Sequence, residues 1–312
     1  MHTGKLTHHP PLLPRKVSNN QSEFRTGVAA AAAAYFCWGL FPIFWKMLDG
    51  IAAIELMAQR ILWCTVTMVG YLAITGKARF WQGVERRTLL TLAGSAALIA
   101  TNWWVYIWAV GHGKIVESSL GYFITPLVNI LFGVVFLRER LNVAQWLAVA
   151  IAASGVTYLA VQTGAPPWIA LTLAVSFGSY GLIRKVAVID AARGLAIEGT
   201  WLLIPAVVFL LVLATRGHGN FGYGNYQIDA LMICSGPLSA IPLLLFAYGA
   251  RRIPLSLIGI LQYIGPTLGL LSGVLLYGEP FTPVQLVGFG LTWIALAIYA
   301  SDSLYRYVRR AP

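Results

Sequence analysis

The chain has 312 residues, of which 58% are hydrophobic and only 11% are charged, and its formal net charge is +11. A soluble globular protein carries about 25% charged residues because its surface must face water, so this composition excludes an ordinary soluble protein and predicts one embedded in a lipid bilayer. In a membrane protein a positive balance is typical of Lys and Arg retained in cytoplasmic loops, so no nucleic-acid partner is expected. The three cysteines form no CxxC pair and the five histidines lie in the N-terminal tail or in loops, so we predict no metal site and no cofactor.

Ten apolar segments follow a polar N-terminal stretch. Residues 1–26 are basic, contain proline and lack the apolar core of a signal peptide, so we predict a disordered cytoplasmic tail. Each apolar segment is close to the length of about 20 residues that spans a bilayer. The ten predicted transmembrane helices are 27–47, 55–75, 88–110, 115–137, 143–162, 166–185, 198–215, 228–249, 254–277 and 283–301. Residues 303–312 are predicted to form a second cytoplasmic tail.

The Lys and Arg residues are distributed between the loops as ten spans require. Of the 22 such residues, 18 fall on the side of the N-terminus, three (Lys46, Lys114 and Arg216) fall on the opposite side, and Arg60 lies within the second span. Because cytoplasmic loops carry the excess of positive residues, this bias predicts that both termini are cytoplasmic. The sequence does not indicate the oligomeric state.

A stretch of the fourth span recurs in the ninth. Residues 120–145 and 260–285 share several residues in one register, 140 positions apart, among them Pro126/Pro266, Gly133/Gly273, Glu139/Glu279 and Gln145/Gln285. This indicates an internal duplication whose unit has five spans. Because five is an odd number of spans, the two copies must enter the membrane from opposite sides. The predicted fold is therefore an all-α integral membrane protein, with ten transmembrane helices as two inverted-topology repeats of five. The repeats cover residues 27–162 and 166–302, and we expect the substrate site near the midplane between them.

Two pairs of residues in this duplication invite a functional interpretation. Pro126 and Pro266 each lie about ten residues into a span and remove a backbone hydrogen bond. We predict that they form hinges or cavity walls; a kink accommodated by packing alone is the alternative. Glu139 and Glu279 each lie between two spans, where a carboxylate complements the dipole of a starting helix, so we predict a structural role for both.

Ionisable residues gather at the outer end of the first repeat. Arg60 lies inside the second span, where a charge is costly and therefore indicates function and a partner. Glu55 and Glu117 are the predicted partners. Together the three side chains are predicted to form a polar mouth that binds the carboxylate and the ammonium of a zwitterion. The alternative is a structural ion pair in which Arg60 reaches outward to the membrane surface.

The third span is rich in aromatic residues. Asn102 and Tyr106 are one helical turn apart on one face, and we predict that they line an aromatic, sparsely polar cavity that suits amphipathic solutes. The other residues predicted to line it are Tyr122, Tyr248, Gln262 and Tyr263. Trp104 and Trp108 lie one turn apart near the outer interface, which is typical of an aromatic belt, and a belt is the alternative for the whole stretch.

Four stretches resemble the RarD branch of the EamA transporters, in the drug/metabolite transporter superfamily. They are YFCWGLFPIFWK at 35–46, TNWWVYIWAV at 101–110, ESSLGYFITPL at 117–127 and LQYIGPTLG at 261–269. The resemblance covers nearly all of the chain beyond the N-terminal tail. It implies ten helices in two inverted halves, a central cavity, a bacterial inner-membrane location and the export of small metabolites or drugs. The family usually has Asn where this chain has Gly111 and Thr125; because Thr125 directly precedes a mid-helix proline, we count it among the candidate substrate-binding residues.

The chain lacks the motifs GxxxxGK[ST], GxSxG and HExxH. The sequence therefore indicates neither a nucleotide-driven motor nor a hydrolase that uses the GxSxG or HExxH motif. We predict a secondary permease that exports small amphipathic metabolites, amino acids or drug-like solutes by alternating access, with a small-molecule substrate and the lipid bilayer as its partners. The alternative is a membrane-embedded enzyme acting on a lipid-linked substrate, for which Glu55, Arg60 and Glu117 are the candidate reactive cluster. A third interpretation is a sensor that does not transport.

Overall fold

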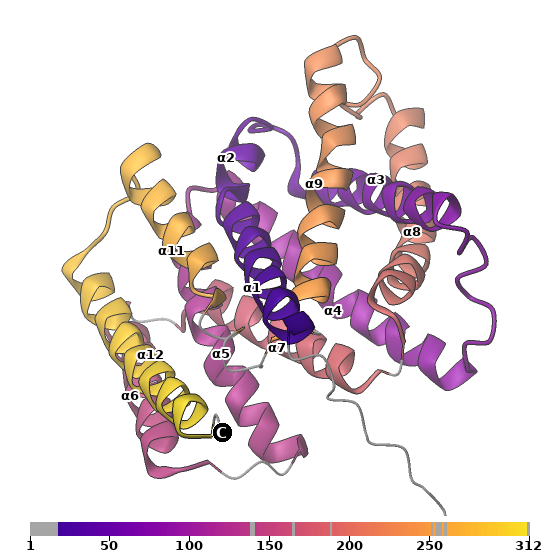
Figure 1. The fold of residues 1–312 in the computed structure, drawn as a ribbon. Helices are drawn as coiled ribbons and strands as arrows, with labels where there is room; N and C mark the ends of the chain where they lie inside the picture. Colours follow the sequence, from indigo (N-terminus) through magenta and orange to yellow (C-terminus); the bar gives the residue numbers. More distant parts are fainter. Residues whose placement is uncertain are drawn as a thin grey trace, which may run out of the picture.

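The fold is described by a computed structural model, which covers residues 18–137, 141–163, 166–187, 189–250, 252–253, 258 and 261–310. The described residues contain helices and connecting turns and no strand. The first half comprises α1 (Ser18–Gly39), α2 (Phe41–Lys46), α3 (Ala53–Ile74), α4 (Arg86–Gly111), α5 (Ile115–Leu137) and α6 (Val143–Thr163). The second half comprises α7 (Trp168–Val186), α8 (Ala191–Thr215), α9 (Tyr226–Ala250), α11 (Ile264–Leu271), the π-helix η1 (Ser272–Leu276) and α12 (Pro283–Arg310) (Figure 1).

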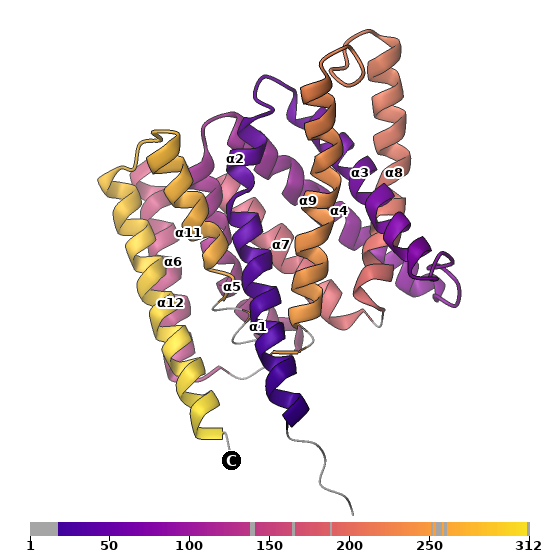
Figure 2. The ribbon, with the colours of Figure 1, turned by 45° about the horizontal axis from the view of Figure 1, so that its top comes forward.

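Eight of the described helical stretches are long and apolar enough to cross a membrane. Two shorter apolar stretches, Trp168–Arg184 and Ile264–Leu276, lie where the sixth and ninth spans were predicted. The predicted all-helical membrane fold is confirmed, whereas the count of ten crossings stays a prediction. α1 begins and α12 ends at the same end of the bundle, as an even number of crossings requires (Figure 2).

The helices at the two ends of the chain are longer than predicted. α1 begins at Ser18, so residues 18–26 are helical and not part of a disordered tail. α12 likewise continues to Arg310 through much of the predicted second tail. A helix satisfies its own backbone groups, and it can therefore project beyond the apolar part of a span. The rest of the first predicted tail, residue Glu139 and parts of the predicted span 254–277 lie outside the described residues.

The first span consists of two helices. α1 ends at Gly39, and α2 begins at Phe41 with Pro42 in its first turn. Proline lacks an N–H and is tolerated where the helix has no acceptor for one, so it favours a restart of the helix at this point. The break presents the ring of Phe41 to the interior, where it is buried.

The packing of the helices is symmetric under exchange of the two repeats. α4 packs on α7 as α9 packs on α1, and α5 packs on α7 as α11 packs on α1. The pair α3–α9 likewise matches α8–α4, while α3–α8 and α6–α12 are pairs of equivalent helices. Close approach depends on small residues: a methyl group added at Gly121 of α5 would lie 2.8 Å from the carbonyl oxygen of Ala170 in α7. An internal duplication predicts this pattern, because equivalent helices then make equivalent contacts.

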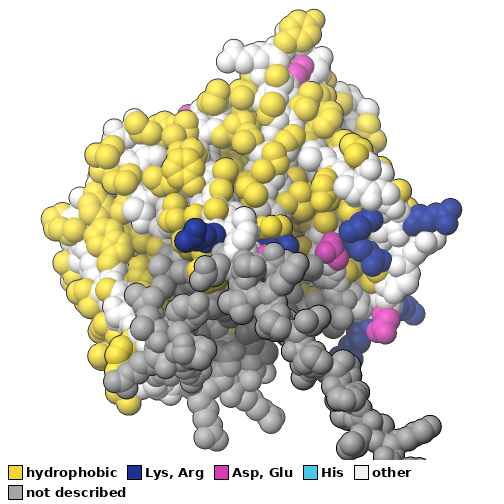
Figure 3. Space-filling model, in the orientation of Figure 1, with side chains coloured by type: hydrophobic (Ala, Val, Ile, Leu, Met, Phe, Trp, Pro, Cys, Tyr) yellow, Lys and Arg dark blue, Asp and Glu magenta, His cyan; other side chains and the backbone are white. Residues whose placement is uncertain are grey.

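The outer surface is apolar. Side chains such as Val143, Ile204 and Leu275 are largely exposed on it. Figure 3 shows hydrophobic side chains over most of the visible, described surface, with Lys, Arg, Asp and Glu confined to small groups. Such a surface is stable where the surrounding medium is lipid and not water.

Candidate functional site

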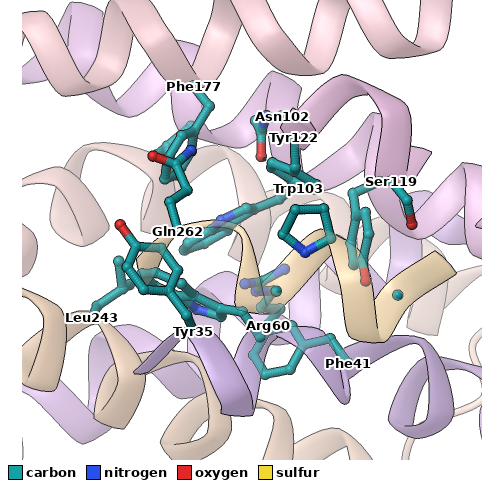
Figure 4. Close-up of a pocket in the computed structure, with 16 residues that line it drawn as sticks. Tyr35, Phe41, Arg60, Asn102, Trp103, Ser119, Tyr122, Phe177, Leu243 and Gln262 are labelled. Atoms are coloured by element: carbon teal, nitrogen blue, oxygen red, sulfur yellow. Dashed lines mark hydrogen bonds between the residues drawn. The ribbon is translucent and has the colours of Figure 1, made fainter. Parts of the chain in front are cut away.

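A cavity of about 80 Å³ lies between the two repeats, in the region where the substrate site was predicted. Its labelled side chains converge on it from helices of both halves (Figure 4). The first repeat contributes Tyr35, Trp38, Phe41, Arg60, Ile99, Asn102, Trp103, Tyr106, Ser119 and Tyr122, and the second contributes Phe177, Leu243, Gln262, Gly265, Pro266 and Gly269. Seven of these 16 residues are aromatic, and Arg60 is the one formally charged residue among the described residues that form the wall.

Arg60 is held by aromatic rings. Its side chain is 3% exposed, and its guanidinium carbon lies 3.9 Å from the centre of the Trp103 ring and 5.4 Å from those of Phe41 and Trp45. Such cation–π contacts contribute about 2 kcal/mol when desolvated. The guanidinium Nε has no hydrogen-bond partner among the described residues. The guanidinium is therefore held in place from its face while its edge retains an unused donor.

Glu55, a predicted partner of Arg60, binds elsewhere. Its side chain is 2% exposed, and its two oxygens accept hydrogen bonds from the backbone N and the side-chain Nδ2 of Asn220, at 2.7 and 2.8 Å. It thereby fixes the α8–α9 loop to the start of α3. Glu55 also lines a second cavity, of about 240 Å³, whose described wall comes from α3, α8 and the α8–α9 loop. This cavity is larger and also lies between helices of both repeats, α3 and α8. However, Glu55 is already paired with Asn220, and no described residue of this wall has a buried side-chain donor without a partner.

Glu117 is the other predicted partner of Arg60, and it too lies outside the cavity wall. It is partly buried in the first turn of α5, where a carboxylate complements the helix dipole. The structure does not bring Arg60, Glu55 and Glu117 together into the predicted polar mouth.

Asn102, Tyr106 and Tyr122 come together as predicted. The Tyr122 hydroxyl donates to Asn102 Oδ1 at 3.0 Å, and the rings of Tyr106 and Tyr122 meet edge to face at 5.7 Å. Asn102 Nδ2 donates to the Leu173 carbonyl and to Ser176 Oγ, both at 3.1 Å. These contacts use both ends of the amide, so Asn102 positions the Tyr122 ring and joins α4 to α7.

Gln262 provides a second buried donor. It is 6% exposed and its Nε2 has no partner among the described residues. Gln262 lies four residues before Pro266, and Tyr122 lies four residues before Pro126. Because a proline cannot donate to the carbonyl four residues earlier, Pro126 leaves the Tyr122 carbonyl inside α5 without its helical donor. Pro266 lies in the first turn of α11, which begins at Ile264, so it removes no hydrogen bond of that helix. Tyr122 and Gln262 are equivalent in the duplication, and both line the cavity.

The other candidates serve packing in this arrangement. Pro126 is buried within α5, and Thr125 beside it donates to the Gly121 carbonyl at 3.0 Å. The Tyr263 ring stacks on Phe123 at 5.9 Å. Tyr248 is 42% exposed and lies against Arg252 outside the cavity. Of the two prolines only Pro266 contributes to the wall.

Sequence reasoning missed most of the aromatic wall. Tyr35, Trp38 and Trp103 lie in stretches noted for their aromatic content, but an aromatic residue in a membrane helix is equally typical of an interfacial belt. The spacing of Tyr35 and Trp38, three residues apart and so on one helix face, was the available signal. Their rings meet edge to face at 5.4 Å.

A second polar cluster surrounds Glu198. This side chain is 1% exposed in α8, and its Oε1 accepts from Ser95 Oγ at 2.7 Å and lies 3.5 Å from Arg184 Nη1. Its Oε2 accepts from the Tyr180 hydroxyl at 3.4 Å. The seventh span was predicted to begin at residue 198, but α8 begins at Ala191, so Glu198 lies two turns inside the helix. The cluster joins α4, α7 and α8.

Glu279 has the predicted structural role, but at a different helix. Its two oxygens accept from the backbone N–H groups of Ile115 and Val116, at 2.9 and 2.8 Å, so it caps the start of α5 and not of the following helix. α12 is capped instead by Thr282 and Gln285, each of which accepts from the backbone N–H of the other. This reciprocal arrangement recurs in Asn142 and Gln145 at the start of α6 and explains why Gln145 and Gln285 occupy equivalent positions.

An all-helical membrane protein built from two repeats, with a cavity where they meet, has the architecture of secondary transporters. The chain belongs to the EamA-like transporter family, whose sequence model matches residues 25–161 and again 167–301. This double match confirms the two repeats.

The relatives extend over nearly the whole chain. The chain is 41% identical over 286 residues to the protein RarD of Salmonella typhi, covering 90% of this chain and 96% of that one. It is 40% identical to an uncharacterized transporter of Pseudomonas aeruginosa, covering 93% and 98%. One solved crystal structure, 17% identical, has the same fold with a TM-score of 0.57 over 88% of this chain and 97% of that one. The resemblance to RarD-like EamA transporters is confirmed.

Proposed function

We propose that the protein is a secondary permease of the bacterial inner membrane, with both termini cytoplasmic, which moves small amphipathic solutes by alternating access. The observation that carries this proposal is the cavity at the junction of the repeats, whose aromatic wall contains two buried donors without partners, on Arg60 and Gln262. Each repeat supplies part of the wall, so a movement of one repeat against the other changes access to the cavity.

The relatives support a transport role. Those that match over nearly the full chain are named as transporters or as RarD, and one from Pseudomonas aeruginosa, 31% identical, is named a chloramphenicol-sensitive protein. The enzyme alternative required Glu55, Arg60 and Glu117 as a reactive cluster. Because neither Glu55 nor Glu117 lines the cavity with Arg60, we favour transport of an unmodified solute.

The test is solute flux in vesicles that contain the purified full chain. Labelled amino acids, short carboxylates and chloramphenicol are offered one at a time, and uptake is compared with protein-free vesicles. We expect saturable, protein-dependent flux of at least one solute, which is recovered chemically unchanged. Flux of none of them above the protein-free level would contradict the proposal, and recovery of a converted product would favour the enzyme.

A further inference from the structure

The formal charge of the cavity wall indicates the charge of its solute. Arg60 is the one formally charged residue among the described residues that line it, and its neighbours there are rings and neutral polar groups. A buried cation is costly unless it is paired. The rings of Trp103, Phe41 and Trp45 lower that cost, but they supply no negative charge and leave Nε unused.

Groups of the second repeat add to the positive electrostatic potential in the same cavity. Gln262 directs an unused Nε2 donor into the buried wall, and it lies just before the start of α11. The first turn of α11 contributes Gly265 and Pro266 to the wall. A helix start carries a partial positive charge, and the side chain of the N-cap residue, Tyr263, makes no capping hydrogen bond here. The cavity therefore offers two donors and a helix start to an acceptor.

The acidic residues that could receive an ammonium group are engaged elsewhere. Glu55 binds Asn220, Glu198 pairs with Arg184, and Glu279 caps α5. Glu117 does not line the cavity. A zwitterion would thus place its carboxylate well, but its ammonium group would enter a site whose charge is already positive.

We propose that the cavity selects a small carboxylate with an apolar or aromatic body, and that it disfavours the zwitterion and the cation of the same shape. The carboxylate neutralises Arg60 and accepts from its Nε and from Gln262 Nε2. Hydrogen bonds between ionised partners are the stronger kind. The body of the solute packs against the rings of Tyr35, Trp38 and Phe177. This inference rests on the proposed permease and names its substrate class.

Two matched series of solutes test the charge preference. One consists of 3-phenylpropanoate, phenylalanine and phenethylamine, and the other of 4-methylpentanoate, leucine and 3-methylbutylamine. Within a series the body is nearly constant while the charge runs from anion through zwitterion to cation. Binding is measured by calorimetry on the full chain in detergent, because weak acids and amines also cross lipid without a protein. We expect a carboxylate to bind about tenfold or more tighter than its zwitterion in at least one series, with the amine weakest.

Substitutions assign the preference to Arg60. Arg60→Gln is expected to remove it, and Arg60→Lys to retain part of it, since lysine keeps the charge without the planar stacking. Gln262→Leu should weaken the carboxylate alone. Arg216→Gln, the matched change at an exposed arginine of the α8–α9 loop, should change nothing. Thermal melting of each variant shows whether it folds. If Arg60→Gln does not fold, the results for Arg60→Lys and Gln262→Leu decide whether the preference depends on these side chains.

Two results would overturn the inference. One is a zwitterion or amine that binds as tightly as the carboxylate in both series, and the other is no binding by either carboxylate. Protein-dependent flux of solutes without any preference for anions would support the permease function and contradict only the proposed substrate class. Conversely, carboxylate binding without flux of any solute would support the binding site and contradict the permease function.

Discussion

Replacing Glu198 with Ala is expected to lower the free energy of unfolding by about 3–5 kcal/mol, because removing one partner of a buried ion pair leaves an uncompensated charge. The side chain is 1% exposed, and its loss leaves Arg184 without its ion partner and the Ser95 hydroxyl without its acceptor. The measurement is reversible unfolding in mixed micelles, compared with the unsubstituted protein.

Two further variants make the Glu198 test specific. The double variant Glu198→Leu/Arg184→Met removes both charges and should recover much of the loss. Glu117→Ala removes a carboxylate that is only partly buried and should change stability little. If Glu198→Ala unfolded like the unsubstituted protein, the cluster that joins α4, α7 and α8 would not have the structural role we assign to it.

Replacing Leu243 with Trp is expected to abolish transport while the protein still folds. Leu243 contributes from α9 to the wall of a cavity of about 80 Å³, and the larger indole would occupy much of that space. Flux in vesicles should fall to the protein-free level, whereas thermal melting should change little.

The matched control for Leu243 is Leu286→Trp. Leu286 is 53% exposed on α12, on the apolar outer surface, so the same substitution there should leave flux unchanged. Undiminished flux in a folded Leu243→Trp variant would mean that the solute does not pass through the cavity.

The helices could be predicted well from sequence, because a span needs a long apolar segment whatever its neighbours are. The ends of the helices could not be predicted, because a helix can continue through polar residues beyond its apolar segment. α1, which begins at Ser18, is an example. The same effect hid Glu198, which was placed at the edge of an apolar segment and lies two turns inside α8.

The candidate site could be predicted in part. Arg60, Asn102, Tyr106, Tyr122, Gln262 and Pro266 were recognised as polar, aromatic or helix-breaking residues within apolar spans, and all line the cavity. The pairing of Arg60 with Glu55 failed for a geometric reason. Five residues of a helix turn through about 500°, so the two side chains point roughly 140° apart. Trp103, which faces Arg60, had no sequence signal that distinguished it from the exposed Trp104 beside it.

The most direct test of alternating access through the central cavity is the accessibility of a single cysteine. Ser119→Cys is a nearly isosteric change in the cavity wall, made in a chain whose Cys37, Cys64 and Cys234 are replaced by serine or alanine. A small anionic methanethiosulfonate that cannot cross lipid is applied to one side of oriented vesicles and then, in separate vesicles, to the other. We predict that it modifies the cysteine from both sides and that a transported solute slows both reactions. Modification from one side alone, whether or not solute is present, would contradict alternating access through this cavity.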